Sequence, residues 1–242
     1  MAPVHLPDNR FSVLVGRYDL NTEFYQLRSA ALFLNSSFGI GPEFGQSGVA
    51  GPSIFPDTSL GVRFAYKPSP DTLVRVAALD GAPLDQQNGS PSTFDHRNGL
   101  LLIAEAALLT RPAASDERFA PRYRIGRGSS PPTYEGKAAV GVWYYTASFD
   151  ELGVTNPTAT PVRHHGEGGA YLLLDRALYQ ATDDSKRRVT WFVQLGIADP
   201  RVDRFGAYVG AGLTAFGMLP GRPADEFGIA ANMARNGAQY VA

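Results

Sequence analysis

Three charged side chains stand alone in apolar segments, and their types limit the chemistry available to this chain. Arg63 lies in TSLGVRFAYK, Arg75 lies in the following segment, and Glu105 interrupts LLLIAEAALL. A guanidinium is a planar hydrogen-bond donor and a carboxylate is an acceptor, so these groups favour noncovalent binding of polar partners. Each is costly in an apolar environment, so we expect the two arginines to face water and Glu105 to point inward or to have a partner.

Covalent catalysis has no support in the sequence. The motifs G-x-S-x-G, P-loop and H-E-x-x-H are missing, and the chain has no cysteine for thiolate metal sites or disulfides. Its one histidine cluster, His164-His165, is expected to be displayed on a loop, and adjacent strand residues would in any case point to opposite faces. We therefore predict no enzyme, no cofactor and no metal.

Composition excludes other classes. The 242 residues carry 22 basic and 23 acidic side chains, a net charge of −1, so no nucleic-acid partner is expected. No apolar run approaches the roughly 20 residues of a membrane-spanning helix, and the N-terminus lacks the apolar core of a signal peptide. These features alone suggest a soluble cytosolic protein, but the strand pattern argues otherwise.

The charged residues lie on segments that alternate between apolar and small or polar side chains. The clearest are 58–67, 188–197, 205–216 and 226–234, each about ten residues long. In the first, Leu60, Val62, Phe64 and Tyr66 share one face, which is typical of a strand with one apolar side. Weaker candidates bring the total to nine strands: 11–19, 72–80, 99–109, 137–149 and 168–176. The best helix signal, within 22–32, allows one or two turns.

Such strands could form a soluble sandwich or a membrane barrel. Sandwich strands average five or six residues, shorter than these. The non-apolar faces carry Gly, Ala, Ser and Thr with sparse charges, and aromatic residues gather at strand ends, as barrels of roughly 9–11-residue strands require. We predict an all-β, antiparallel transmembrane β-barrel, with the soluble sandwich as the alternative.

A long aromatic loop fits the same architecture. The segment LFLNSSFGIGPEFGQSGVAGPSIFP, residues 32–56, has four Phe, five Gly and one charge, Glu43. Up-and-down connections place 19–57, 81–98, 150–167 and 199–204 at one rim. A loop with so little charge is expected to fold back inside the barrel; its alternative is a loop packed over a soluble core.

Several blocks of the chain resemble a known family, the carbohydrate-selective porins called OprB. The resemblance rests on VLVGRYDLNTEF, NSSFGIGPEF, LLLIAEAAL, GVWYYTASFD and PGRPADEFG, in this chain order. It implies a sixteen-stranded barrel in the outer membrane of a Gram-negative bacterium, in contact with bilayer and lipopolysaccharide, through which monosaccharides diffuse. Residues 20–57 would be the inward-folded loop that narrows the pore, and the parent could be a monomer or a homotrimer.

Members of that family are longer than this chain, so residues 1–242 are expected to be one incomplete porin barrel domain without its first and last strands. Wide channels need about 16–18 strands, whereas eight leave an interior filled by side chains. An open sheet edge in lipid leaves unpaired backbone groups at a cost of tens of kcal/mol. The fragment alone is therefore not expected to form a working pore.

Sugar passage would require hydroxyl-binding groups at the constriction. The residues expected there, from the barrel wall and the loop, are Arg17, Asp19, Asn21, Glu23, Asn35, Glu43, Arg63, Arg75 and Glu105. Alternatives remain: Arg17 and Asp19 could form an ion pair at the rim, and Arg63 and Arg75 could be general lumen charges.

The leading hypothesis is passive, carbohydrate-selective diffusion through a loop-narrowed pore. The first alternative is a structural or adhesive outer-membrane barrel with a plugged lumen, which should fill its interior with bulky side chains. The second is an outer-membrane hydrolase, which would need a nucleophile and a base on neighbouring strands.

Overall fold

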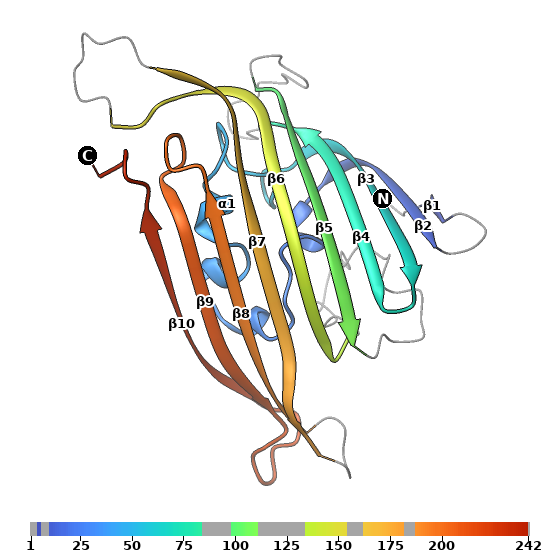
Figure 1. Cartoon of the computed structure of the whole chain (residues 1–242). Helices are drawn as coiled ribbons and strands as arrows, with labels where there is room; N and C mark the ends of the chain where they lie inside the picture. The colour runs from blue at the N-terminus through green and yellow to red at the C-terminus, as the bar shows by residue number, and fades with distance from the viewer. Residues whose placement is uncertain are drawn as a thin grey trace.

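The computed structural model describes residues 4–5, 10–83, 98–110, 134–153, 162–181 and 187–241. Within these ranges ten strands form a single antiparallel sheet in which each strand pairs with the next along the chain (Figure 1). The strands are β1 (Val4–His5), β2 (Phe11–Tyr18), β3 (Ser59–Ser69), β4 (Thr72–Asp80), β5 (Leu100–Thr110), β6 (Gly136–Asp150), β7 (Arg163–Gln180), β8 (Arg188–Ala198), β9 (Phe205–Phe216) and β10 (Glu226–Asn236).

The nine expected strands correspond to β2 to β10, so the all-β antiparallel prediction is confirmed. The two-residue β1 was not expected, and β7 is much longer than the predicted 168–176. Its extension takes in His164 and His165, so their expected display on a loop is wrong. They pair with Phe149 and Ser148 of β6, next to a register shift between Tyr145 and Ser148.

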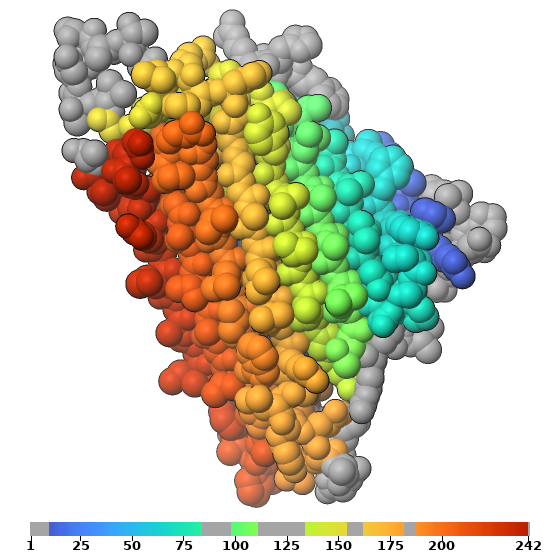
Figure 2. All heavy atoms as spheres, viewed as in Figure 1, coloured from blue at the N-terminus to red at the C-terminus, as the bar shows by residue number. Residues whose placement is uncertain are grey.

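The outer face of the sheet is apolar and exposed. It carries Phe64, Val76, Leu102, Val142, Tyr144, Leu195, Ile197, Leu213 and Ile229, among others. Figure 2 shows this face, where side chains of neighbouring strands form a continuous surface that hides the β2–β3 loop. The alternation read from β3, β8 and β9 thus separates an exposed apolar face from a covered one, whereas β10 is exposed on both faces along most of its length.

The hydrophobic core lies on the inner face, between the sheet and the long loop that joins β2 to β3. This loop, residues 19–58, contains three short 3₁₀ helices, η1 (Leu20–Thr22), η2 (Ala30–Leu32) and η3 (Ser36–Phe38), and the single turn α1 (Pro42–Gly45). In Figure 1 it lies behind the sheet, which curls around it. The loop's Leu20, Phe24, Tyr25, Leu27 and Phe44 are buried with Trp143, Tyr171, Leu173 and Phe192 of the strands. The predicted helical region 22–32 contains only the turns at its two ends.

Glycines on the inner face make room for these aromatic rings. A Cβ at Gly141 would stand 2.1 Å from the Tyr171 ring, and one at Gly169 would stand 2.5 Å from Trp143. Phe44 of the loop stacks on Trp143 with ring centroids 4.9 Å apart. The small residues of the strands therefore accommodate packed rings in the described part of the chain, rather than an open water-filled surface.

The longest helix in the described ranges has four residues. None of the described helices is both long and apolar enough to cross a bilayer.

Candidate functional site

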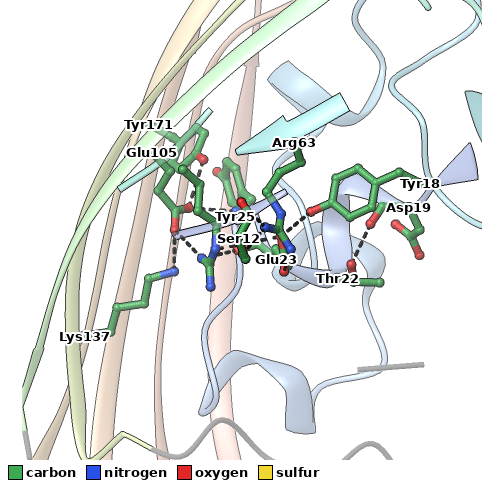
Figure 3. Close-up of polar contacts among 11 residues, drawn as sticks. Ser12, Tyr18, Asp19, Thr22, Glu23, Tyr25, Arg63, Glu105, Lys137 and Tyr171 are labelled. Atoms are coloured by element: carbon green, nitrogen blue, oxygen red, sulfur yellow. Dashed lines mark hydrogen bonds and ion pairs between the residues drawn. The ribbon is translucent and has the colours of Figure 1, made fainter. Parts of the chain in front are cut away.

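A network of buried charges holds the first half of the loop against the sheet (Figure 3). Glu23 of the loop meets Arg63 of β3, with Nε 2.7 Å from Oε2 and Nη2 donating to Oε1 at 2.9 Å. Arg63 is 0% exposed, and its Nη1 also donates to the Ser12 hydroxyl at 2.6 Å. The Tyr18 hydroxyl donates to the same carboxylate at 2.7 Å. Both members of this ion pair are thus surrounded by protein partners.

A second carboxylate continues the network across the next strands. Glu105 of β5 accepts from the Lys137 ammonium at 2.9 Å and from the Tyr171 hydroxyl at 3.0 Å. Arg75 approaches it at 3.5 Å and also donates to the backbone carbonyl of Glu23 at 2.9 Å. The loop contributes the Tyr25 amide, which donates to Glu105 at 3.0 Å. The sheet therefore presents fixed charges whose partners are backbone and side chains of the loop.

We call this charge network the clamp, because it joins charged groups of the sheet to side chains and backbone of the loop. Three cations, Arg63, Arg75 and Lys137, neutralise two carboxylates, Glu23 and Glu105. Burying ions costs several kcal/mol each, which good geometry recovers, but removing one partner leaves an uncompensated charge and costs about 3–5 kcal/mol. In the described contacts, these charged groups pair with one another and bond to the loop.

Hydroxyl and amide groups anchor the middle of the loop. Ser29 donates through its amide and its hydroxyl to Asp175 of β7, at 3.0 and 2.8 Å, and its hydroxyl also lies 2.8 Å from that of Thr190. Further along, Gln194 of β8 donates to the Phe38 carbonyl at 2.9 Å. Tyr208 of β9 donates to the Ser37 carbonyl at 2.8 Å.

The far end of the loop rests on carboxyl groups instead of ion pairs. Glu43, in α1, is 0% exposed and accepts from the Tyr25 hydroxyl at 2.9 Å. Burial raises the pKa of Glu43 to about 7. The Gly48 amide donates to Glu167 of β7 at 2.8 Å. Gly196 of β8 leaves space for this end, because a Cβ there would stand 1.8 Å from the Glu43 carboxylate.

Four of the residues predicted at a constriction lie in the charge network: Glu23, Arg63, Arg75 and Glu105. The expected inner face is correct for Arg63, Arg75 and Glu105, and Glu105 has the partners it was expected to need. The expectation that Arg63 faces water is wrong, because the loop covers it completely. Glu23, Glu105 and Glu43 are likewise buried, so none of these three carboxylates lines open space in the described structure.

The other predicted residues are dispersed. Asp19 and Asn21 are half-buried at the loop's start, where Asp19 accepts from the Asn21 amide at 3.0 Å. Asn35 is exposed and accepts from the Ser37 amide at 3.0 Å. Arg17 is also exposed, but it pairs with Leu60 and so points to the outer face. Its expected place in the constriction is corrected, and no ion pair in the described ranges joins it to Asp19.

The sequence reasoning missed Lys137, which donates to the Gln26 carbonyl of the loop at 3.0 Å, and Asp175, which accepts from Ser29 of the loop. In the alternation along its strand, each residue falls on the inner face, where a charged side chain needs a partner. This position in the alternation could have identified both residues, as it identified Arg63 and Glu105.

The opposite side of the loop is its free surface. Leu34 is 103% exposed, and Asn35, Ser36 and Val49 are exposed as well. The buried network, by contrast, has no part in this exposed surface.

An antiparallel sheet with an apolar outer face and a loop fixed on its inner face has the architecture of part of a membrane barrel of the porin class. The chain belongs to the carbohydrate-selective porin family, OprB, because the model of that family matches residues 5–239. Porins of this kind are channels and not enzymes.

Solved structures agree with this assignment at the level of the fold. The high-pH structure of Pseudomonas putida OprB matches with a TM-score of 0.72 and 17% identity, covering 98% of this chain and 54% of that chain. The low-pH structure of the same protein matches with a TM-score of 0.51 and 16% identity, covering 96% of this chain and 50% of that chain. The chain thus spans about half the length of these porins. No curated protein matches it.

Proposed function

We propose that this chain is the loop-bearing part of a Gram-negative outer-membrane channel through which small sugars diffuse passively. The observation that carries the proposal is the clamped loop: residues 19–58 are fixed by buried contacts to the inner face of a sheet whose outer face is apolar. A bilayer would cover that outer face, and the loop would narrow the bore.

The pore itself requires a closed barrel. β1 and β10 each have a paired neighbour on one side only within the described sheet, and open edges are not tolerated in hydrocarbon. Channels wide enough for water and solutes have about 16–18 strands. We propose that further strands complete the barrel, either as a monomer or within a homotrimer, in an outer leaflet of lipopolysaccharide.

Selectivity in this proposal comes from the free surface of the loop. Asn35 and Ser36 present amide and hydroxyl groups that match sugar hydroxyls in donor and acceptor capacity. Asp19 and Asn21 are half-buried and would contribute at the edge of the constriction. Four buried residues would affect selectivity only indirectly, by holding the loop in place: Arg63, Glu23, Glu105 and Glu43.

Liposome swelling tests the proposal directly. The full barrel containing this chain, reconstituted in liposomes, should admit glucose markedly faster than sucrose, because the loop-narrowed bore favours the smaller solute. Equal and negligible rates for both sugars would contradict it. Protein-free liposomes and heat-denatured protein provide the baseline.

A plugged structural barrel is the second candidate, and one observation favours it. The inner face carries bulky buried rings, including Trp143, Tyr145, Tyr171 and Phe192, as a blocked lumen requires. Single-channel conductance separates the two candidates. A plugged barrel should give no conductance steps in a planar bilayer, whereas the proposed channel should give discrete ones.

A further inference from the structure

The two ends of the loop are held by different chemistry, and the far end is the unusual one. Three carboxyl groups are buried there: Glu43 of the loop at 0% exposure, Glu167 of β7 at 3% and Asp203, between β8 and β9, at 2%. The Gly48 amide donates to Glu167 and the Phe205 amide donates to Asp203, both at 2.8 Å. We call these three carboxyl groups the seat; it links residues 41–48, which carry Glu43, to β7 and to the connection between β8 and β9.

Cations do not balance this seat. Within the described ranges no ion pair involves any of the three carboxyls, in contrast to Glu23 and Glu105 at the other end. One oxygen of Glu43 and one of Asp203 have no donor among the described residues. No three acidic or histidine side chains in the described part of the chain stand close enough to hold a metal ion. An uncompensated buried carboxylate is far too costly to persist, so protons are the means of neutralisation that fits.

The groups that face the seat are neutral donors or further acids. Around Glu43 they are the hydroxyls of Tyr25 and Tyr208 and the more distant Asp203. Around Glu167 and Asp203 they are the Tyr145 hydroxyl and Asp199, whose own charge is matched by Arg201.

Glu167 and Asp203 are close enough to interact electrostatically. Two ionised carboxylates repel each other and neither can donate a hydrogen bond, so a proton on one of them stabilises the pair. Loss of the proton would place two like charges side by side in a buried position.

We propose that residues 41–48 form a proton-dependent latch, docked on β7, β8 and the β8–β9 connection while these carboxyls hold protons and released when they ionise. The clamp at the other end, with its charges already paired, would keep residues 20–30 in place. Release would therefore move one end of the loop, changing the width of the passage without freeing the loop as a whole. The consequence for sugar passage rests on the proposed function, but the latch itself does not.

The direction of the pH dependence follows from burial. Burial raises the pKa of Glu43 to about 7 and that of Asp203 to about 6. The docked state thus binds these protons more tightly than a released, solvated state would. Docking is most favourable below the ordinary pKa of a carboxyl group, and it weakens as pH rises toward about 7.

Thiol labelling can measure the latch without any transport assay. The chain has no cysteine, so Ser47→Cys introduces a single buried reporter, and Gln46→Cys provides an exposed control beside it. The ratio of the two labelling rates in the reconstituted barrel cancels the pH dependence of thiolate formation. We expect this ratio to rise by about a hundredfold between about pH 5 and pH 9.

Substitutions identify the groups responsible. Glu43→Gln should reduce the rise to about tenfold or less, and the double variant Glu43→Gln with Asp203→Asn should reduce it further, leaving only the contribution of Glu167. Asp57→Asn, an exposed loop acid, is the matched control and should leave the rise unchanged. If Glu43→Gln does not fold, Asp203→Asn alone still distinguishes the outcomes, because it too should flatten the rise.

A ratio that stays within twofold over this range in the parent protein would overturn the latch. So would a full rise that persists in the double variant. If swelling assays show no sugar passage but the thiol ratio behaves as expected, the proposed function fails and the latch stands. If sugars pass but the thiol ratio stays flat, the latch is rejected and the proposed function stands.

Discussion

Replacing Arg63 by methionine tests whether buried charge holds the first half of the loop. The change leaves Glu23 buried without its closest cation, which stands 2.7 Å away in the structure. Such a loss costs about 3–5 kcal/mol. The Tyr18 hydroxyl remains, and the nearest nitrogen of Arg75 is 3.9 Å from the same carboxylate. These contacts place the expected cost at the low end, about 3 kcal/mol, which is roughly a 150-fold shift in the equilibrium between clamped and released loop.

A thiol at Ala30, 1% exposed and without a polar side chain to lose, reports this release. Its labelling rate in the reconstituted barrel should rise by about two orders of magnitude in the Arg63→Met background. Arg17→Met is the matched control, since Arg17 points to the outer face and its loss should change the rate less than twofold. The double variant Arg63→Met with Glu23→Gln should recover part of the loss, because it removes the stranded charge.

Two outcomes would refute the reasoning. A rise of less than threefold in Arg63→Met would mean that the ion pair does not hold the loop. Additive effects of the two single changes would mean that Arg63 and Glu23 are not energetically coupled, whatever their distance.

Three further changes probe other parts of the site. Lys137→Met removes a cation from the buried Glu105 and should raise labelling at Ala30 by one to two orders of magnitude, about 1.4–3 kcal/mol; an unchanged rate would exclude Lys137 from the clamp. Gly196→Ala should displace the far end of the loop, because the new Cβ would meet the Glu43 carboxylate; normal burial of the Ser47→Cys reporter would show that the loop does not pack as described. Asn35→Asp keeps an acceptor for its capping bond but adds a charge to the free surface of the loop, so reversal-potential measurements should show greater cation preference; an unchanged potential would place Asn35 away from the passage.

The strands could be predicted because one physical rule produces them. Residues of β3 alternate between a face that meets an apolar exterior and one that meets the loop, so Arg63 was assigned to the correct side from its neighbours alone. The same rule was ambiguous in β2, where Leu14 is buried under the loop while Val15 is exposed on the other face. With apolar residues on both faces, the pattern gave no orientation for Arg17.

The contacts of the loop could not be predicted in this way. Glu23 and Arg63 are 40 positions apart, and Ser29 and Asp175 are 146 apart, so no local period joins them. The glycines of the inner face were also ambiguous. Small residues there are compatible with a water-filled bore, but they are equally required where a ring or carboxylate packs tightly, as Gly141 does beneath Tyr171 and Gly196 beneath Glu43.

The contrast between the two ends of the loop leads to one final expectation. Glu23 and Glu105 each have a cation beside them, so their contacts do not depend on a shared proton. The seat that links residues 41–48 to the sheet depends on protons instead. The Ala30→Cys reporter, compared with an exposed thiol, should therefore show less than threefold change in relative rate from about pH 5 to pH 9, while the Ser47→Cys reporter shows about a hundredfold change. Parallel changes at both positions would mean that the loop opens as one unit. The inference that ion pairs hold one end of the loop and protonated carboxyl groups hold the other would then be wrong.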